Sequence, residues 1–240
     1  MRVVLENEYG NEHPLTAVTA EAVHALRTLG FSVASGPEVE TEFYNFDALN
    51  IPADHPARDM WDTFWVKGKA EDGSRRLLRT HTSPVQVRRM MADGAPLKIV
   101  APGKVYRHEA TDATHEAQFH QIEGLWIAEN VTMADLKGTL DAFFKEFFGP
   151  EAEIRFRPSY FPFVEPGVEI DVRFGGKWLE VMGAGMVHRK VLESCGVDPE
   201  RYRGFAFGGG LDRFLMIRRG VTDVRDVYRP DFRFLARFIA

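Results

Sequence analysis

The 240-residue chain contains one cysteine, Cys195, and no long apolar run. A single cysteine can form neither an internal disulfide nor a thiolate metal cluster, which agrees with a reducing compartment and argues against redox chemistry. The longest apolar runs, such as 97–101, are far below the roughly 20 residues of a membrane helix, and the N-terminus lacks a signal-peptide pattern. We therefore expect a soluble, cytoplasmic protein with no membrane partner.

Several common catalytic motifs are also absent. No G-x-x-x-x-G-K-[ST] phosphate loop occurs, and Arg213 stands where the dinucleotide loop would need a third glycine after Gly208 and Gly210. His115 and His120 are five residues apart, whereas a zinc-protease helix needs four. No G-x-S-x-G elbow is present. Any chemistry must therefore proceed without a side-chain nucleophile.

Composition predicts one globular domain spanning 1–240, because 45% of the residues are hydrophobic and 12% aromatic. A formal net charge of −5 argues against bulk attraction to nucleic acid. The charge is uneven, since nine arginines and four aspartates lie in 201–240. This basic end either faces phosphates or an acidic partner, or forms a solvated surface of mixed charge.

Hydrophobic periodicity predicts both helices and strands. The helical segments are 15–29, a helix with Ser83 as N-cap and Pro84 at its first position, 132–148 and 211–218. The extended segments are 31–34, 97–100, a strand through Val105 and Arg107 after a turn at Pro102-Gly103, 119–128, and a hairpin of 168–174 with 177–182. This order predicts an α+β fold, with an antiparallel sheet flanked by helices.

One predicted strand face is too polar to be a core. Alternation places Phe119, Gln121 and Glu123 on the same face. Arg107 and Glu109 share a face of the preceding strand. If the two strands pair, Arg107 and Gln121 converge on one small ligand, and the alternative is a solvated hairpin end.

The segment 160–166 carries aromatic rings between two prolines, Pro162 and Pro166. Proline is a poor strand centre, so we expect a stiff edge segment. Its rings either form the wall of an apolar pocket or belong to ordinary core packing.

Taken together, these residues resemble the class II aminoacyl-tRNA synthetases, and in particular the catalytic domain of the phenylalanyl-tRNA synthetase alpha subunit. The similarity runs from about His13 to Phe238. Segments similar to the three class II motifs are 30–37, then 105–109 with 119–124, and 204–213. Segments more particular to the phenylalanine enzyme are 45–50, 79–83, 111–115 and 160–163. The ordered set is far more specific than any one motif.

The resemblance implies a six- to seven-stranded antiparallel sheet, ATP as substrate and Mg²⁺. Phenylalanine is first activated to its adenylate, and the acyl group then passes to tRNA(Phe). By position, Arg107 would hold the α-phosphate and the carboxylate, while Arg213 would take the γ-phosphate and lie over adenine. Phe119 would stack on the other side of the base, Glu109 would help fix it, and His115 would meet phosphate.

The same resemblance implies an amino-acid pocket. Four residues would surround the substrate ammonium: His81, Ser83, Gln121 and Glu123. Phe161 and Phe163 would face the substrate ring, Ala206 would leave room for it, and Trp61 would belong to the same pocket. Glu180 is the expected Mg²⁺ ligand.

Partners and departures also follow from the resemblance. The family works with a larger beta subunit, where editing normally resides, so the first helix and the aromatic stretch 43–65 are candidate partner surface. An isolated chain would be unstable or form a homodimer. No heptads precede His13, so we expect the family's N-terminal coiled coil to be missing and tRNA charging to be less secure than adenylate formation. Asp212 and Arg189 stand where Glu and Pro are usual.

Two other functions remain open at this stage. One is a paralogue that makes an aminoacyl-adenylate for another acceptor, and the other is a non-catalytic amino-acid-binding subunit. A non-catalytic subunit would not need the following residues together, so their joint presence argues against it: Arg107, Glu109, Phe119, Gln121, Glu123 and Arg213.

Overall fold

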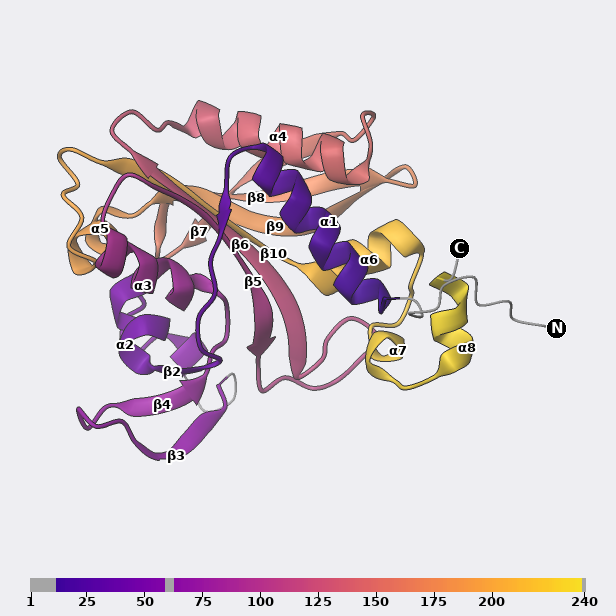
Figure 1. Ribbon diagram of the computed structural model, residues 1–240, viewed down its shortest axis with the longest axis horizontal. Coiled ribbons are helices and arrows are strands. Elements are labelled where there is room, and N and C mark those ends of the chain that lie inside the picture. Colours follow the sequence, from indigo (N-terminus) through magenta and orange to yellow (C-terminus); the bar gives the residue numbers. More distant parts are fainter. Residues whose placement is uncertain (1–11, 59–62, 239–240) are drawn as a thin grey trace.

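A seven-stranded sheet forms the centre of the computed structural model, which describes residues 12–58 and 63–238 (Figure 1). Across the sheet the strands are β1 (Ser32–Val33), β5 (Leu97–Tyr106), β6 (Gln118–Ala128), β10 (Arg203–Gly210), β9 (Lys177–Val187), β8 (Val164–Phe174) and β7 (Ile154–Phe161). Only β1 pairs in parallel, with β5, and every other pairing is antiparallel. The predicted α+β fold is therefore confirmed.

One face of this sheet carries the larger hydrophobic core. Helices α1 (Pro14–Thr28), α4 (Met133–Phe148) and α6 (Leu211–Arg219) lie along it in Figure 1. Helix α4 starts at a capping box in which Thr132 and Asp135 bond each other's backbone amides. Four phenylalanines of α4 lie with ring centroids 5.4–6.1 Å from the ring of Phe214 on α6. This aromatic contact fixes α6 against α4.

The opposite face is covered by shorter elements. These are α2 (Glu42–Asn45), the 3₁₀ turns η1 (Asp47–Leu49) and η2 (Pro56–Arg58), α3 (Ser83–Asp93) and α5 (Arg189–Ser194). A small antiparallel sheet lies beside them, in the order β2 (Val39–Thr41), β4 (Arg75–Leu78) and β3 (Trp65–Lys69). Phe46 is only 1% exposed and the inner face of α1 is buried, whereas Phe43 is exposed, so a partner surface on these elements stays a prediction for their outer faces.

The C-terminal segment contains α7 (Arg225–Tyr228), α8 (Phe232–Leu235) and η3 (Ala236–Phe238). In Figure 1 these elements lie beside α6, at the end of the molecule nearest the start of α1. No helix in the described part of the chain is long and apolar enough to cross a membrane.

The sequence prediction was wrong at three local points. The expected turn at Pro102-Gly103 is instead part of the continuous strand β5. β1 pairs with β5 only at Ile99 and Val100, so Pro102 lies beyond it, where a missing N–H is tolerated. Arg107 and Glu109 follow the strand in a loop and do not share one of its faces. Thr82, not Ser83, is the N-cap of α3.

Candidate active site

An open cleft of about 950 Å³ lies on the sheet face that the shorter helices cover incompletely. Every predicted site residue in the described ranges lines it: His81, Ser83, Arg107, Glu109, His115, Phe119, Gln121, Glu123, Phe161, Phe163, Glu180, Ala206 and Arg213. Trp61 lies outside the described residues. Chain segments more than 130 residues apart in sequence therefore meet in one cavity.

The side chains of β6 alternate between the two faces of the sheet, and one set of them forms part of the floor of the cleft. Phe119, Gln121 and Glu123 line the cavity, whereas Ile122 between them is buried in the core on the other face. The expected pairing with β5 is confirmed, with Gly103 opposite Gln121 and the Arg107 amide bonded to the Ala117 carbonyl. Arg107 and Gln121 thus line one cleft, as their spacing predicted.

The carboxylate of Glu123 is 5% exposed and is held by the N-terminal end of α3. It accepts hydrogen bonds from the Thr82 amide at 2.8 Å, the Ser83 hydroxyl at 2.5 Å and the Gln86 side-chain amide at 3.0 Å. Burial raises the pKa of Glu123, and the bonds from Ser83 and Thr82 oppose that rise. The anion also suits the positive end of the helix dipole. Gln86 was missed because no sequence signal links it to Glu123.

Two polar groups beside Glu123 lack strong partners. The Oε1 atom of Gln121 and both ring nitrogens of His81 are buried without a well-formed hydrogen bond to a described residue, and the Asn45 backbone is only a weak partner of the His81 ring. Burial, followed by the charge of Arg107, lowers the pKa of His81 to about 3, so the ring stays neutral. Buried polar atoms are normally paired. Unpaired acceptors that line a cleft indicate a site for a ligand with N–H donors.

Arg107 lies at the mouth of the loop 107–117. Its Nε donates to the Thr80 carbonyl at 3.2 Å, and its guanidinium lies 5.0 Å from the centre of the Phe119 ring. Its terminal nitrogen is 4.0 Å from the Glu109 carboxylate. Anchored through Nε, the guanidinium fork is oriented and can present its terminal N–H groups to an anion.

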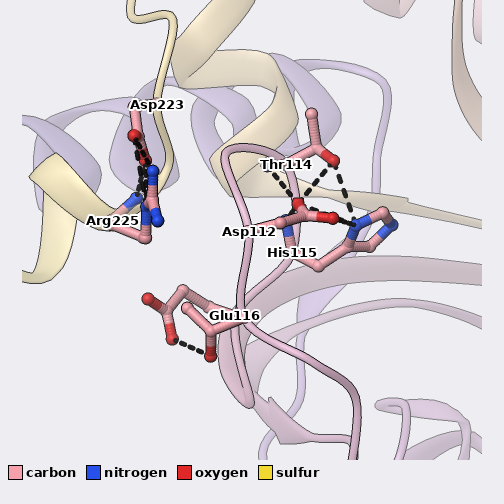
Figure 2. Close-up of polar contacts among 7 residues, drawn as sticks. Asp112, Thr114, His115, Glu116, Asp223 and Arg225 are labelled. Carbon is pink, nitrogen blue, oxygen red and sulfur yellow. Dashed lines mark hydrogen bonds and ion pairs between the residues drawn. The ribbon is translucent and has the colours of Figure 1, made fainter.

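The side chain of Asp112 holds the rest of this loop in place by hydrogen bonds to residues of its own turn (Figure 2). Its carboxylate accepts from the Thr114 amide at 2.7 Å, the His115 amide at 2.9 Å and the His115 ring Nδ1 at 3.0 Å. These bonds, that of Thr114 first, hold the pKa of Asp112 well below its usual range. The same bonds orient the imidazole of His115, whose side chain lines the cleft.

Arg213 enters the cleft from the first turn of α6. Within the described part of the chain, its guanidinium has no hydrogen bond or ion pair. The preceding residue, Asp212, is 5% exposed and bonds the backbone amide of His120 at 2.6 Å and the hydroxyl of Tyr228. The aspartate that replaces the usual glutamate is therefore fully engaged in hydrogen bonds behind the cleft. Arg189 similarly begins α5, where proline would fit, and pairs with Glu193 and Glu200.

Two glycines make room for the side chains of the site. A Cβ at Gly208 would lie 2.8 Å from Cγ of Glu123. A Cβ at Gly183 would lie 3.0 Å from the ring of Phe161. The glycine run 208–210 thus admits the Glu123 side chain over β10.

An apolar wall closes the far end of the cleft. The rings of Phe161 and Phe163 stack with centroids 5.8 Å apart in the β7–β8 hairpin, which the Asn50 side chain secures by donating to the Pro162 carbonyl at 2.7 Å. The predicted edge segment is thus a hairpin turn. Other apolar residues that line the cleft were not predicted: Phe46, Leu49, Met90, Leu125, Val187 and Val191. They come from helices and strands whose apolar patterns look like those of any core.

The carboxylate of Glu180 lines the cleft and is largely exposed to solvent. It is 61% exposed and pairs with Arg157 at 3.1 Å. No group of three His, Cys, Asp or Glu side chains in the described ranges is arranged to hold a metal. Mg²⁺ normally binds one or two protein carboxylates plus substrate phosphates, so Glu180 and its neighbour Glu169 suit that role.

Comparison with known proteins shows the family to which the chain belongs. The family model described as tRNA synthetases class II core domain (F) matches residues 4–238. The phenylalanine–tRNA ligase alpha subunit of Synechocystis sp. is 55% identical over 95% of this chain and 67% of its own length. That of Caldicellulosiruptor saccharolyticus is 51% identical over 96% and 70%, so the chain spans about two thirds of such relatives.

Solved structures agree on the fold. Pyrrolysyl-tRNA synthetase from Desulfitobacterium hafniense superposes with a TM-score of 0.69 at 21% identity, covering 90% of this chain and 74% of that one. At this identity the likeness concerns the architecture alone.

Proposed function

Because the chain belongs to the class II tRNA synthetases, among the phenylalanine–tRNA ligase alpha subunits, we propose that its cleft activates phenylalanine with ATP for transfer to tRNA(Phe). The observation that carries the proposal is the convergence of Arg107, Arg213 and the polar face of β6 in one cavity. The two arginines supply cations to the cleft, and Phe161 and Phe163 supply its apolar wall.

The nucleotide lies at the arginine end of the cleft. The Arg107 fork binds the α-phosphate and the attacking carboxylate, and it stabilises the negative charge that builds as the carboxylate displaces pyrophosphate. Arg213 and His115 bind the outer phosphates. Phe119 and Arg213 enclose the adenine, and Glu109 accepts from it. Catalysis is by positioning and charge, which agrees with the absence of a nucleophile motif.

The amino acid occupies the other end. The ammonium group donates to the two acceptors left without strong partners, Gln121 Oε1 and the neutral His81 ring. Glu123 supplies the negative charge nearby, and Ser83 helps to hold it in place. The side-chain ring lies among Phe161, Phe163 and Ala206, because edge contacts with aromatic rings and a single methyl leave a flat apolar space.

Mg²⁺ fits this arrangement as a cofactor of the ATP phosphates. When bound through Glu180, it would neutralise phosphate charge, which is its usual contribution in phosphoryl transfer. The residues of the chain then bind, orient and shield the reacting groups.

For the second step the acyl group passes to tRNA(Phe), and the native assembly contains a beta subunit. The support is the alpha-subunit name that the relatives carry. Selection against tyrosine by an apolar wall yields only about a hundredfold, so editing belongs to the partner.

The test is phenylalanine-dependent exchange of pyrophosphate into ATP by the purified chain assembled with its beta subunit. We expect exchange that saturates with phenylalanine and falls at least about a hundredfold in Arg107→Ala, as for loss of a preorganised charge-stabilising donor. Arg75→Ala is the matched control, because Arg75 lies over the Trp65 ring in the small sheet. Phenylalanine binding without exchange would indicate a non-catalytic subunit, and exchange without charging in the presence of the beta subunit would indicate another acceptor.

A further inference from the structure

Asp212 and Arg213 are adjacent in the first turn of α6 but serve opposite faces of the sheet. Arg213 lines the cleft. Asp212 lies behind it, where one carboxylate oxygen accepts from the His120 amide at 2.6 Å and the other from the Tyr228 hydroxyl. The guanidinium of Arg213 has no protein partner among the described residues. The direction of its side chain therefore depends on the backbone of the turn, which the hydrogen bonds of Asp212 hold in place.

Tyr228 also contacts β6 directly. Its hydroxyl is 3.2 Å from Nδ1 of His120, and the two rings are stacked at an interplanar angle of 12°. His120 lies between Phe119 and Gln121, which line the cleft, and Gln121 pairs with Gly210 at the start of α6. Tyr228 thus clamps the point where β6, β10 and α6 meet.

The segment that carries Tyr228 holds the loop 107–117 as well. The Val224 amide donates to the Ala113 carbonyl at 2.9 Å. Figure 2 shows the Asp223–Arg225 pair beside the turn of Asp112 and His115. Hydrogen bonding to Asp223 raises the pKa of Arg225, and the charge of Asp112 adds to that rise. The loop 107–117 and the segment 223–228 are therefore joined by a backbone hydrogen bond, and the charges of Asp112 and Arg225 lie close enough to interact.

We propose that Tyr228 is a positioning residue for the nucleotide: through Asp212 it fixes the turn that carries Arg213, while Val224 in the same segment fixes the loop that carries His115. This inference rests on the proposed function, since both residues are assigned there to the ATP phosphates. Arg213 and His115 are 98 positions apart in sequence, and the segment 223–228 sets their spacing. Misplacement by even 1 Å can cost a large factor in such positioning.

Tyr228→Phe in the full chain removes only the hydroxyl. We expect the KM for ATP to rise about tenfold, as for a lost hydrogen bond to a charged group, while the KM for phenylalanine stays within about twofold. Tyr202→Phe is the control, because Tyr202 precedes the opposite end of β10 and does not line the cleft. A merely structural role would change both constants together, or neither.

A second pair of variants separates the backbone contact from packing. Val224 has φ −62°, which proline adopts, so Val224→Pro removes the N–H donor, whereas Val224→Ala keeps it. We expect Val224→Pro to raise the KM for ATP several-fold above the value for Val224→Ala.

The outcomes separate this proposal from the proposed function. Exchange by the wild type with unchanged ATP dependence in Tyr228→Phe and Val224→Pro would overturn the positioning role and leave the function standing. If the wild type shows no exchange, the function fails, and calorimetric binding of ATP decides the positioning role. Weaker ATP binding by Tyr228→Phe than by Tyr202→Phe supports it, whereas equal affinities, or no binding by the wild type, overturn it.

Discussion

The hydroxyl of Ser83 donates a 2.5 Å hydrogen bond to the buried carboxylate of Glu123, which is also held by Thr82 and Gln86. This contact joins the start of α3 to the centre of β6. It fixes the carboxylate that we propose attracts the substrate ammonium to two elements of the fold.

The pH dependence of kcat/KM for phenylalanine should respond to the hydrogen bond between Ser83 and Glu123. Burial raises the pKa of Glu123 above its usual 4.5, and the Ser83 bond lowers it. As pH falls through that raised pKa, the carboxyl takes up a proton and loses the charge that attracts the ammonium group. We therefore expect an acid limb in kcat/KM for phenylalanine, and we expect Ser83→Ala to move it to higher pH.

The control is Ser74→Ala, since Ser74 also donates to a carboxylate, that of Asp72, but does so at 2.6 Å in an exposed turn. An acid limb that stays in place in Ser83→Ala, or moves equally in Ser74→Ala, would contradict the assignment of the limb to Glu123.

His81 should make the folded state sensitive to acid. Its pKa is lowered to about 3 by burial and then by Arg107, whereas the unfolded ring titrates near 6.5. Below pH 6.5 the unfolded chain gains a proton that the folded chain does not, so stability falls as pH falls. Between pH 7 and 5 the wild type should lose about 2 kcal/mol more unfolding free energy than His81→Gln. Urea titrations at both pH values measure this, with exposed His24→Gln as control.

Ala206 should set the size of the ring pocket. Its methyl lines the same cleft as Phe161 and Phe163, so Ala206→Gly should admit para-substituted phenylalanines, and Ala206→Val should reject phenylalanine. Rates of pyrophosphate exchange with phenylalanine and with a para-substituted phenylalanine measure this change in preference. Ala101→Gly removes a methyl from the same core without lining the cleft. Unchanged preference in both Ala206 variants would remove this residue from the pocket.

Gly208 should be intolerant of a side chain. In Gly208→Ala the new methyl would meet Cγ of Glu123 at 2.8 Å, and overpacking of this kind costs about 1–3 kcal/mol. We expect reduced stability and a larger rise in KM for phenylalanine than for ATP. Gly138→Ala is the matched control, because its methyl meets nothing within 4 Å in α4 and should stabilise the helix by about 0.5–1 kcal/mol. Equal behaviour of the two variants would contradict the close approach of Glu123.

The sequence predicted those parts of the fold that depend on local periodicity. The capped helix α4 and the hairpin β8–β9 were found because capping residues, a Gly-Gly turn and strict alternation act within a few residues. The polar face of β6 was found for the same reason. Pro102 misled the prediction, because its tolerance in β5 depends on how far β1 extends along the neighbouring edge.

The site was predictable where a residue's chemistry is unusual for its position, as with Glu123 on a strand. It was not predictable where the role depends on distant contacts. Gln86 looks like a surface residue of a helix, yet it is 4% exposed and bonds Glu123. Tyr228 lies 16 positions beyond Asp212, in a segment whose short helix gives no sign of the hydroxyl's target.

The division of β6 into two alternating sets of side chains bears on how such an enzyme can change over time. Odd-numbered positions from Phe119 to Glu123 touch the ligand space, and even-numbered Ile122 touches only the core. If the proposed function holds, substitutions at odd positions can therefore alter which amino acid is accepted while the hydrophobic core is spared. An insertion of one residue would exchange the two sets and destroy both at once. Diversification along this strand is thus expected to proceed by replacement and never by changes in length.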